Sequence, residues 1–258
     1  MTASGGARGA SGGAGGQARG GRRRAVITGG SGGIGRACAE TLAARGYELL
    51  LVARRPEPLE QAAAALGARW VAADCRRADD LAKVAEAAGP VDLLIQAAGV
   101  LEGTFVTDQP IETFDRVIDA NLRSAYLVTR ALLPSMGAGG RIVFVSSTAG
   151  ITGMKGLSAY SASKAALGEL AHSLSLELER DGIAVHVVAP APVRTEMIDL
   201  GTKRKMWLLE PEDVASAVAW LDTLHPRVRV REVVLRSVTG GPYAPEPIGE
   251  RGGAEGEE

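Results

Sequence analysis

The sequence predicts an α/β protein in which one sheet of about seven parallel strands carries helices on both faces. Three observations support this fold class. Short apolar stretches alternate with helical patterns from residue 24 to residue 235, which is typical of βαβ units. Stretches such as 91–95 and 142–145 lack polar alternation, as expected of strands covered on both faces. A glycine-rich turn follows the first strand, so we expect a single Rossmann-like, doubly wound domain.

The first strand and helix are the best defined elements. Residues 24–28 form a β-branched apolar run, and residues 34–45 carry helix formers with apolar positions at Ile34, Ala37, Cys38 and Leu42. Further strands are expected near residues 48–53, 69–73, 91–95, 141–145, 183–188 and 231–235. Further helices are expected near residues 57–66, 79–88, 111–136, 159–180 and 211–223. Right-handed crossovers would bring the carboxyl ends of all these strands to one edge of the sheet.

Both ends of the chain differ from the predicted domain, residues 23–241. Residues 1–22 consist almost entirely of Gly, Ala, Ser and Arg, and residues 242–258 alternate Pro, Gly and Glu. We expect both tails to be disordered, because they cannot bury enough apolar surface to fold. Residues 1–22 also contain no apolar core that could act as a signal peptide or membrane span.

Composition argues against several classes of protein. A net charge of −1 provides no field that would attract nucleic acid. Cys38 and Cys75 are the only cysteines of the sequence, too few for a disulfide framework and without metal-ligand spacing. We therefore expect a cytoplasmic protein with reduced thiols, no metal, and no nucleic-acid or membrane partner.

The turn Thr28-Gly-Gly-Ser-Gly-Gly-Ile-Gly35 predicts a dinucleotide site. Its glycines remove the Cβ atoms that would keep a pyrophosphate from the backbone, and the following helix offers unpaired N–H groups. The turn fits both Gly-x-Gly-x-x-Gly, from Gly30, and Thr-Gly-x-x-x-Gly-x-Gly, from Thr28. The alternative is a flexible linker, but linkers lack flanking strand and helix periodicity.

Tyr160, Lys164 and Ser147 form the second chemical pattern. A four-residue spacing places Tyr160 and Lys164 on one face of a helix, about one turn apart. A lone phenol titrates near pH ~10, but a neighbouring cation stabilises the phenolate and lowers its pKa. The pair therefore predicts a proton donor and acceptor.

These motifs, in their order, resemble the short-chain dehydrogenase/reductase family over about residues 23–238. The resemblance rests on the glycine turn, Ala98-Gly99, Asn121, Ser146-Ser147, Tyr160-Ser-Ala-Ser-Lys164 and Pro190-Ala-Pro-Val-Arg-Thr195. It implies that Tyr160 is the catalytic acid or base, and that Lys164 lowers its pKa and holds the nicotinamide ribose. It also implies that Ser147 binds the substrate oxygen and that Asn121 anchors a proton relay. The serine-to-tyrosine gap favours Ser147 over Ser146.

The type of nicotinamide cofactor depends on the end of the second strand, Ala53-Arg54-Arg55. An acidic residue there would bind the ribose 2′-hydroxyl of NAD, and Glu48 stands at the opposite end of the strand, roughly 17 Å away. A guanidinium at Arg54 suits a 2′-phosphate, so we expect NADP(H) rather than NAD(H). The alternative is that Arg54 and Arg55 are solvated loop charges. The expected cofactor contacts are Gly29, Ser31, Gly33, Ile34, Gly35, Arg54, Asp74, Ala98, Gly99, Tyr160, Lys164, Pro190, Val193 and Thr195.

Three features depart from the family pattern. Gln96-Ala97 replaces two asparagines, which removes a side chain that ties the centre of the sheet. Ala191 replaces a glycine, and the stretch between Arg194 and Trp207 is short for a substrate lid. These departures put the geometry and the substrate scope in doubt but leave the catalytic groups in place.

We therefore predict an NADP(H)-dependent reductase of ketones or aldehydes, with Tyr160 as the proton donor. One alternative is a 3-hydroxy acid dehydrogenase of the same family, and another is a non-catalytic NADP-binding sensor. An apolar substrate pocket is indicated by Ile151, Met154, Leu157, Met197, Ile198 and Trp207. A carboxylate substrate is indicated by Lys155, Lys203, Arg204 and Lys205. The helices near 111–136 and 159–180 resemble the family's self-association surface, which predicts a homodimer or homotetramer.

Overall fold

The computed structural model describes residues 22–197 and 208–238. Except for Arg22, the two predicted tails lie outside these residues. Ile198, Lys203, Arg204, Lys205 and Trp207, which entered the two substrate hypotheses, also lie outside them.

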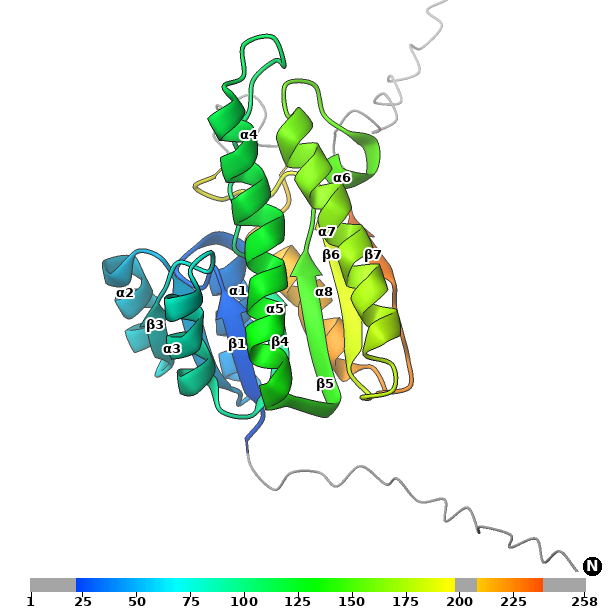
Figure 1. Ribbon diagram of the computed structural model, residues 1–258. Coiled ribbons are helices and arrows are strands. Elements are labelled where there is room, and N and C mark those ends of the chain that lie inside the picture. Colours follow the sequence, from blue (N-terminus) through cyan, green and yellow to red (C-terminus); the bar gives the residue numbers. More distant parts are fainter. Residues whose placement is uncertain (1–21, 198–207, 239–258) are drawn as a thin grey trace, which may run out of the picture.

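The described residues form one sheet of seven parallel strands in the order β3-β2-β1-β4-β5-β6-β7 (Figure 1). The strands are β1 (Arg24–Thr28), β2 (Glu48–Ala53), β3 (Arg69–Ala72), β4 (Val91–Gln96), β5 (Met136–Val145), β6 (Ala184–Pro190) and β7 (Glu232–Leu235). The chain moves outward from β1 to β3 and then returns to place β4 on the other side of β1. This reversal opens a crevice at the carboxyl edge between β1 and β4, where doubly wound proteins bind ligands.

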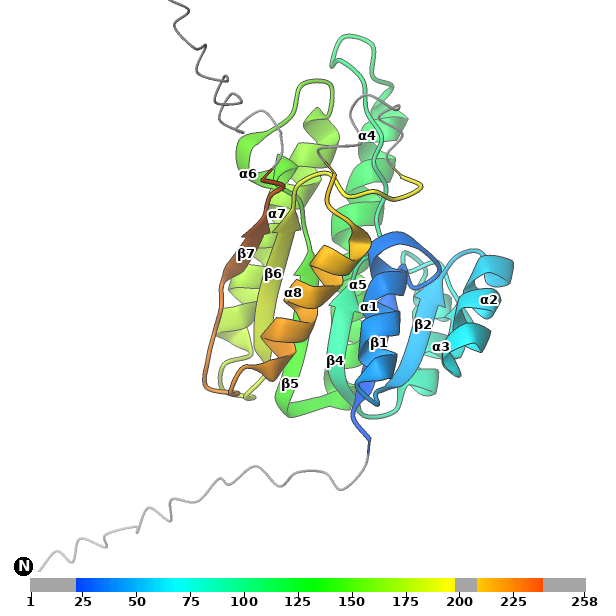
Figure 2. The same cartoon turned by 180° about the vertical axis from the view of Figure 1, so that it is seen from behind.

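Helices cover both faces of the sheet (Figures 1 and 2). One apolar core joins the sheet to α1 (Gly33–Ala44), α2 (Pro56–Leu66) and α8 (Pro211–Thr223). A second core joins the opposite face to α3 (Ala78–Ala88), α5 (Ser124–Leu132) and α7 (Ser158–Glu177). Leu50 and Leu51 on β2 point to opposite faces, and both are fully buried. Burial on two sides explains why the strands lack polar alternation, and the predicted fold class is confirmed.

The single helix predicted over residues 111–136 is wrong in its details. The segment contains α4 (Ile111–Ile118), a π-helical turn η1 (Asp119–Arg123), α5 and a short 3₁₀ turn η2 (Leu133–Ser135). Pro134 cannot continue an α-helix, and β5 begins directly afterwards at Met136. Met136 pairs with Val91 before the register shifts, because the glycine-rich stretch 137–140 interrupts regular pairing.

Two further differences are local. A four-residue helix, α6 (Ala149–Thr152), stands where no helix was expected. The helix α7 ends at Glu177 instead of residue 180, because the chain turns back at Gly182, whose φ is +68°, toward β6. The other strand and helix boundaries lie within two residues of the prediction.

The Gln96 side chain connects the centre of the sheet to α5 by hydrogen bonds. This corrects the expectation that replacing asparagine at this position removes such a connection. Its side chain is 4% exposed, and Nε2 donates to the Ala125 carbonyl at 2.9 Å and to Thr129 Oγ1 at 2.7 Å. The longer glutamine side chain therefore connects β4 to the neighbouring helix through an amide with buried hydrogen-bond partners.

Replacing Gln96 by Leu should lower the free energy of unfolding by about 1–2 kcal/mol, because two buried hydrogen bonds are lost while apolar volume is kept. Urea unfolding followed by circular dichroism measures this change. Gln61→Leu on the exposed surface of α2 is the matched control, with an expected change within about 0.5 kcal/mol. Equal urea midpoints for the Gln96 variant and the parent would contradict a stabilising role for the hydrogen bonds between Gln96 and α5.

Candidate active site

Two glycines of the turn after β1, Gly29 and Gly35, pack too closely against backbone to carry a side chain. Gly29 has φ +73° and Gly33 has φ +51°, a region that L side chains rarely adopt. A Cβ on Gly35 would lie 2.3 Å from the Gly29 carbonyl oxygen. The first turn of α1 contains no acidic residue, and no side chain of the described residues caps its N-terminal N–H groups. The turn therefore presents backbone donors and a positive helix end, which fits an anionic pyrophosphate.

A cleft of about 520 Å³ opens beside this turn. Ten of the predicted cofactor contacts line it: Gly29, Ser31, Gly33, Ile34, Gly35, Arg54, Asp74, Ala98, Gly99 and Thr195. Tyr160, Lys164, Pro190 and Val193 do not line it. Pro190 is buried at the end of β6, and Val193 is 4% exposed and paired with Leu209. Thr195 reaches back toward the turn, since its Cγ2 lies 3.1 Å from the position of a Cβ on Gly33.

The acidic side chains of the cleft are already paired. Asp74 contacts Arg76 at 2.6 Å, and Glu102 contacts Arg116 on α4 at 2.6 Å. Glu196 contacts Arg55 at 3.7 Å. Within the described residues, no ion pair involves the remaining cation of the cleft, Arg54. The cleft therefore offers one uncommitted guanidinium just beyond the carboxyl end of β2.

Asp74 was expected to contact the cofactor, and the structure adds a partner that the sequence did not reveal. Both carboxylate oxygens accept hydrogen bonds from Arg76, at 2.9 Å from Nε to Oδ1 and 2.6 Å from Nη2 to Oδ2. These bonds are the main reason that the pKa of Asp74 falls to about 2. Arg76 lines the cleft but was not among the predicted site residues, because sequence spacing does not show which neighbouring arginine turns inward.

Asn121 lies in the π-helical turn η1 and joins three parts of the site. Its Oδ1 accepts from the Val100 N–H at 2.7 Å, and its Nδ2 donates to the Val100 carbonyl at 3.0 Å. Nδ2 also donates to Ser163 Oγ at 3.0 Å, and Ser163 donates to the Tyr160 carbonyl at 2.7 Å. A Cβ on Gly99 would lie 2.9 Å from Asn121 Oδ1, so this approach requires glycine. The loop after β4, η1 and α7 are thereby held together.

Lys164 lies beside Tyr160, as the four-residue spacing predicts. Its side chain is buried, with Nζ 5.8 Å from the centre of the Tyr160 ring and 2.9 Å from the Val145 carbonyl, to which it donates. Burial lowers the pKa of Lys164 to about 8, because desolvation disfavours the ammonium. The ammonium is thus placed between the end of β5 and the phenol.

The predicted lowering of the Tyr160 pKa is wrong for this structure. Burial raises the pKa of Tyr160, and hydrogen bonding with Ser147 opposes only part of that rise. No lowering by the Lys164 ammonium accompanies this rise, and Lys164 Nζ donates to the Val145 carbonyl at 2.9 Å. The phenol is therefore held in its protonated form at neutral pH.

Ser146 and Ser147 follow β5, and their hydroxyl groups have different hydrogen-bond partners. Ser146 is 6% exposed and donates to the Lys164 carbonyl at 2.9 Å, so its hydroxyl fixes α7. Ser147 Oγ accepts from the Ala149 N–H at 3.1 Å and lies within reach of the Tyr160 hydroxyl. Ser147 is thus the serine that can meet a substrate together with Tyr160.

The described residues show neither a membrane span nor a metal cluster. None of the helices in residues 22–197 and 208–238 has the length and apolar character needed to span a bilayer. The same residues contain no group of three or more His, Cys, Asp or Glu side chains placed to hold a metal ion.

Comparisons with known proteins agree with this geometry. A family profile described as short chain dehydrogenase matches residues 23–205. An uncharacterized oxidoreductase of Staphylococcus epidermidis is 34% identical over 225 residues, which cover 83% of this chain and 96% of that protein.

Solved structures show the same similarity. An alcohol dehydrogenase from the archaeon Thermococcus sibiricus, complexed with 5-hydroxy-NADP, has a TM-score of 0.77 and 30% identity over 86% of this chain and 99% of its own. A short chain dehydrogenase from Burkholderia cenocepacia, in complex with NADP, has a TM-score of 0.75 and 27% identity over 83% and 96% of the two chains. With its sheet order, glycine turn and Ser147, Tyr160 and Lys164 in these places, the chain belongs to the short-chain dehydrogenase/reductase family.

Proposed function

We propose that this oxidoreductase is an NADP(H)-dependent reductase of ketones or aldehydes, with Tyr160 as the proton donor. The observation that carries the proposal is the meeting of Tyr160, Ser147 and Lys164 at the edge of the sheet that also holds the glycine turn. Burial keeps the phenol protonated, and a protonated phenol is what carbonyl reduction requires.

In the proposed reaction, the Ser147 and Tyr160 hydroxyls donate hydrogen bonds to the substrate carbonyl oxygen. Tyr160 then transfers its proton to that oxygen as negative charge develops on it. Lys164 stabilises the resulting phenolate through its charge, and Asn121 holds the backbone of the catalytic helix through Ser163. A bound nicotinamide would supply the hydride that the carbonyl carbon receives.

The preference for NADP(H) over NAD(H) rests on Arg54. It lines the cleft just after β2, and the residues that follow this strand, Arg54 and Arg55, include no acidic residue that could bind a ribose 2′-hydroxyl. Glu48 cannot take that role, because it opens β2 at the opposite edge and pairs with Arg24 at 2.9 Å. The NADP ligands named for the two solved relatives support the same choice.

An apolar substrate is favoured over a carboxylate substrate. In the segments that follow β4, β5 and β6, four apolar side chains are between 46% and 52% exposed: Phe105, Ile151, Met154 and Met197. Lys155 is the described cation proposed to meet a carboxylate, and its Nζ lies 5.5 Å from the centre of the Phe105 ring. This cation–π contact gives the ammonium a partner of its own. A 3-hydroxy acid remains the second candidate substrate.

We also propose a cytoplasmic homodimer or homotetramer that associates through α5 and α7. A shallow hollow between these helices is lined by Leu122, Arg123, Tyr126, Ala166, Glu169, Leu170 and Ser173. Tyr126 and Leu176 are 48% and 67% exposed on the same helices. Exposed apolar side chains beside a hollow are typical of protein interfaces.

Replacing Tyr160 by Phe should lower kcat for carbonyl reduction by about 10²–10⁴-fold, because the proton donor is removed. NADPH affinity should change little. Initial rates with a mixed ketone, aldehyde and 3-oxo acid panel, with NADPH titrated by fluorescence, measure both effects. Trp220→Phe on the exposed surface of α8 is the control and should keep the parental rate. Parental turnover by the Tyr160 variant would refute the proposed role, and NADPH binding without any turnover in the parent would favour a sensor.

Replacing Arg54 by Asp should raise the Kd for NADPH by about 10–100-fold, because a charge-assisted contact becomes a repulsion. The Kd for NADH should change by less than about threefold, since NADH lacks the 2′-phosphate. Titration calorimetry with both nucleotides measures the two values. An equal loss for NADPH and NADH would contradict a contact between Arg54 and the 2′-phosphate.

Carbonyl reduction should slow above pH about 8, where Lys164 loses its charge. Below that pH the ammonium stabilises the phenolate left after proton transfer, and above it the neutral amine cannot. Tyr160 does not cause this decline, because its raised pKa keeps the phenol protonated. A pH profile of kcat/KM at saturating NADPH measures the effect. A profile that stays flat to pH ~9.5 would be incompatible with this assignment.

A further inference from the structure

The contact between Arg76 and Asp74 has the geometry of a clamp. Arg76 offers Nε and Nη2 to the two carboxylate oxygens, at 2.9 Å and 2.6 Å, and its backbone N–H donates to Oδ1 at 3.0 Å. The two side chains are 32% and 23% exposed, and both line the cleft. A lysine could not occupy both oxygens at once, whereas the planar guanidinium can.

The clamped carboxylate lies near the cation assigned to the cofactor. Strands β2 and β3 are neighbours with Ala53 paired to Ala72, so Arg54 and Asp74 leave the same edge side by side. The positive charge of Arg54 is felt by Asp74 and contributes to the low pKa of its carboxyl. A carboxylate without its own partner at this place would attract Arg54 and repel a 2′-phosphate.

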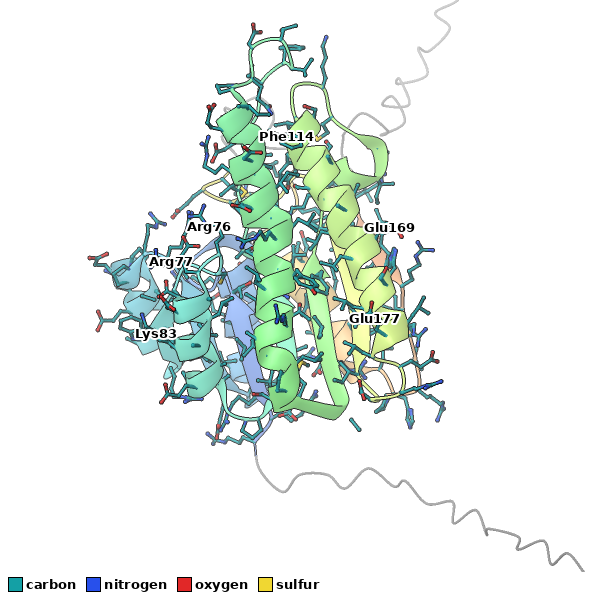
Figure 3. The ribbon with its side chains drawn as sticks, viewed as in Figure 1. Arg76, Arg77, Lys83, Phe114, Glu169 and Glu177 are labelled. Atoms are coloured by element: carbon teal, nitrogen blue, oxygen red, sulfur yellow. The ribbon has the colours of Figure 1, made fainter. Side chains whose placement is uncertain are left out.

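The guanidinium of Arg76 interacts with two acidic side chains. Besides Asp74, the charge of Asp119 in η1 acts on its guanidinium. Figure 3 shows Arg76 and Arg77 above α3. In this view Arg76 is the nearer of the two to the continuous helical stretch formed by α4, η1 and α5. Arg76 is therefore placed to neutralise Asp74, while Arg54 remains without a carboxylate partner among the described residues.

We propose that Arg76 is a positioning residue for cofactor selectivity: by clamping Asp74, it keeps the Arg54 guanidinium available for the 2′-phosphate of NADP(H). This inference rests on the NADP(H) preference proposed above. It assigns no contact between Arg76 and the phosphate. If this is so, removing Arg76 weakens binding of the 2′-phosphate because the negative charge of Asp74 is no longer neutralised.

Binding of adenosine 2′,5′-diphosphate and 5′-AMP to the full chain tests this role without any turnover. In Arg76→Gln, the Kd for the diphosphate should rise about 10-fold, while the Kd for 5′-AMP changes less than about twofold. Combining Arg76→Gln with Asp74→Asn should return the diphosphate Kd to within about threefold of the parent, because the amide cannot form an ion pair with Arg54. Titration calorimetry provides both dissociation constants for each protein.

Arg77→Gln is the matched control. Its side chain is 67% exposed, reaches Asp80 at 4.0 Å and does not line the cleft. Both dissociation constants should stay at the parental values. Affinity for adenosine 2′,5′-diphosphate should therefore fall in Arg76→Gln but not in Arg77→Gln, although the two arginines are adjacent.

Three results would overturn the role of Arg76. One is an equal loss for both nucleotides in Arg76→Gln, which would indicate direct adenosine contact or a damaged fold. Another is parental affinity in that variant, and the third is no recovery in the double variant. If the parent binds both nucleotides equally, the NADP(H) preference itself falls and the positioning role falls with it. A parent that prefers the diphosphate, with an unaffected Arg76 variant, would refute the positioning role alone.

Discussion

Burial of the sheet on both faces is the constraint that determines where this protein can place polar chemistry. Ile27, Leu94 and Phe144 belong to three different strands, and all are inaccessible to solvent. An unpaired polar group on either face would be removed from water without compensation, which costs several kcal/mol by order of magnitude. Gln96 is buried in the sheet only because its amide has partners on α5.

The carboxyl edge is free of this constraint, because the strands end there and their loops leave the core. The glycine turn follows β1, Gly99 follows β4 and Ser147 follows β5. Neighbouring parallel strands bring these loops together even though the residues are far apart in sequence. The same arrangement brings Arg54 and Asp74 into one cleft from the ends of β2 and β3.

Asn121 shows how positioning and chemistry are combined at this edge. The family resemblance assigns it to a proton relay, but its side-chain atoms already pair with the backbone of Val100 and with Ser163. Ser163 in turn holds the carbonyl of Tyr160. A loss of activity in an Asn121 variant could therefore arise from displacement of Tyr160 as well as from loss of the relay. Rate measurements alone do not separate these two causes.

Much of the fold was predictable because its signals are local. Apolar runs without alternation mark buried strands, and the glycine turn marks the first crossover. The π-helical turn at Asn121 was missed because one extra residue barely changes the apolar periodicity of a long helical segment. The start of β5 at Met136 was missed because the stretch 137–140 is rich in glycine and gives no strand signal.

The candidate site was less predictable where it depends on pairing and burial. Sequence spacing placed Tyr160 and Lys164 on one helix face, but it could not show that burial raises the pKa of the phenol. Nor could it show that Glu196 pairs with Arg55, because these residues are distant in sequence and come together only at the cleft. Charge pairing of this kind depends on tertiary structure.

Burial of both members of the Tyr160 and Lys164 pair also bears on reaction direction. Desolvation disfavours the charged form of each group, so the pKa of the phenol rises while that of the amine falls to about 8. At neutral pH the tyrosine is protonated and the lysine still carries most of its charge. An enzyme that oxidises an alcohol needs the phenolate at the start, whereas one that reduces a carbonyl needs the phenol. Under the proposed chemistry, the protonated tyrosine is the state from which carbonyl reduction starts, and alcohol oxidation would start with removal of that proton.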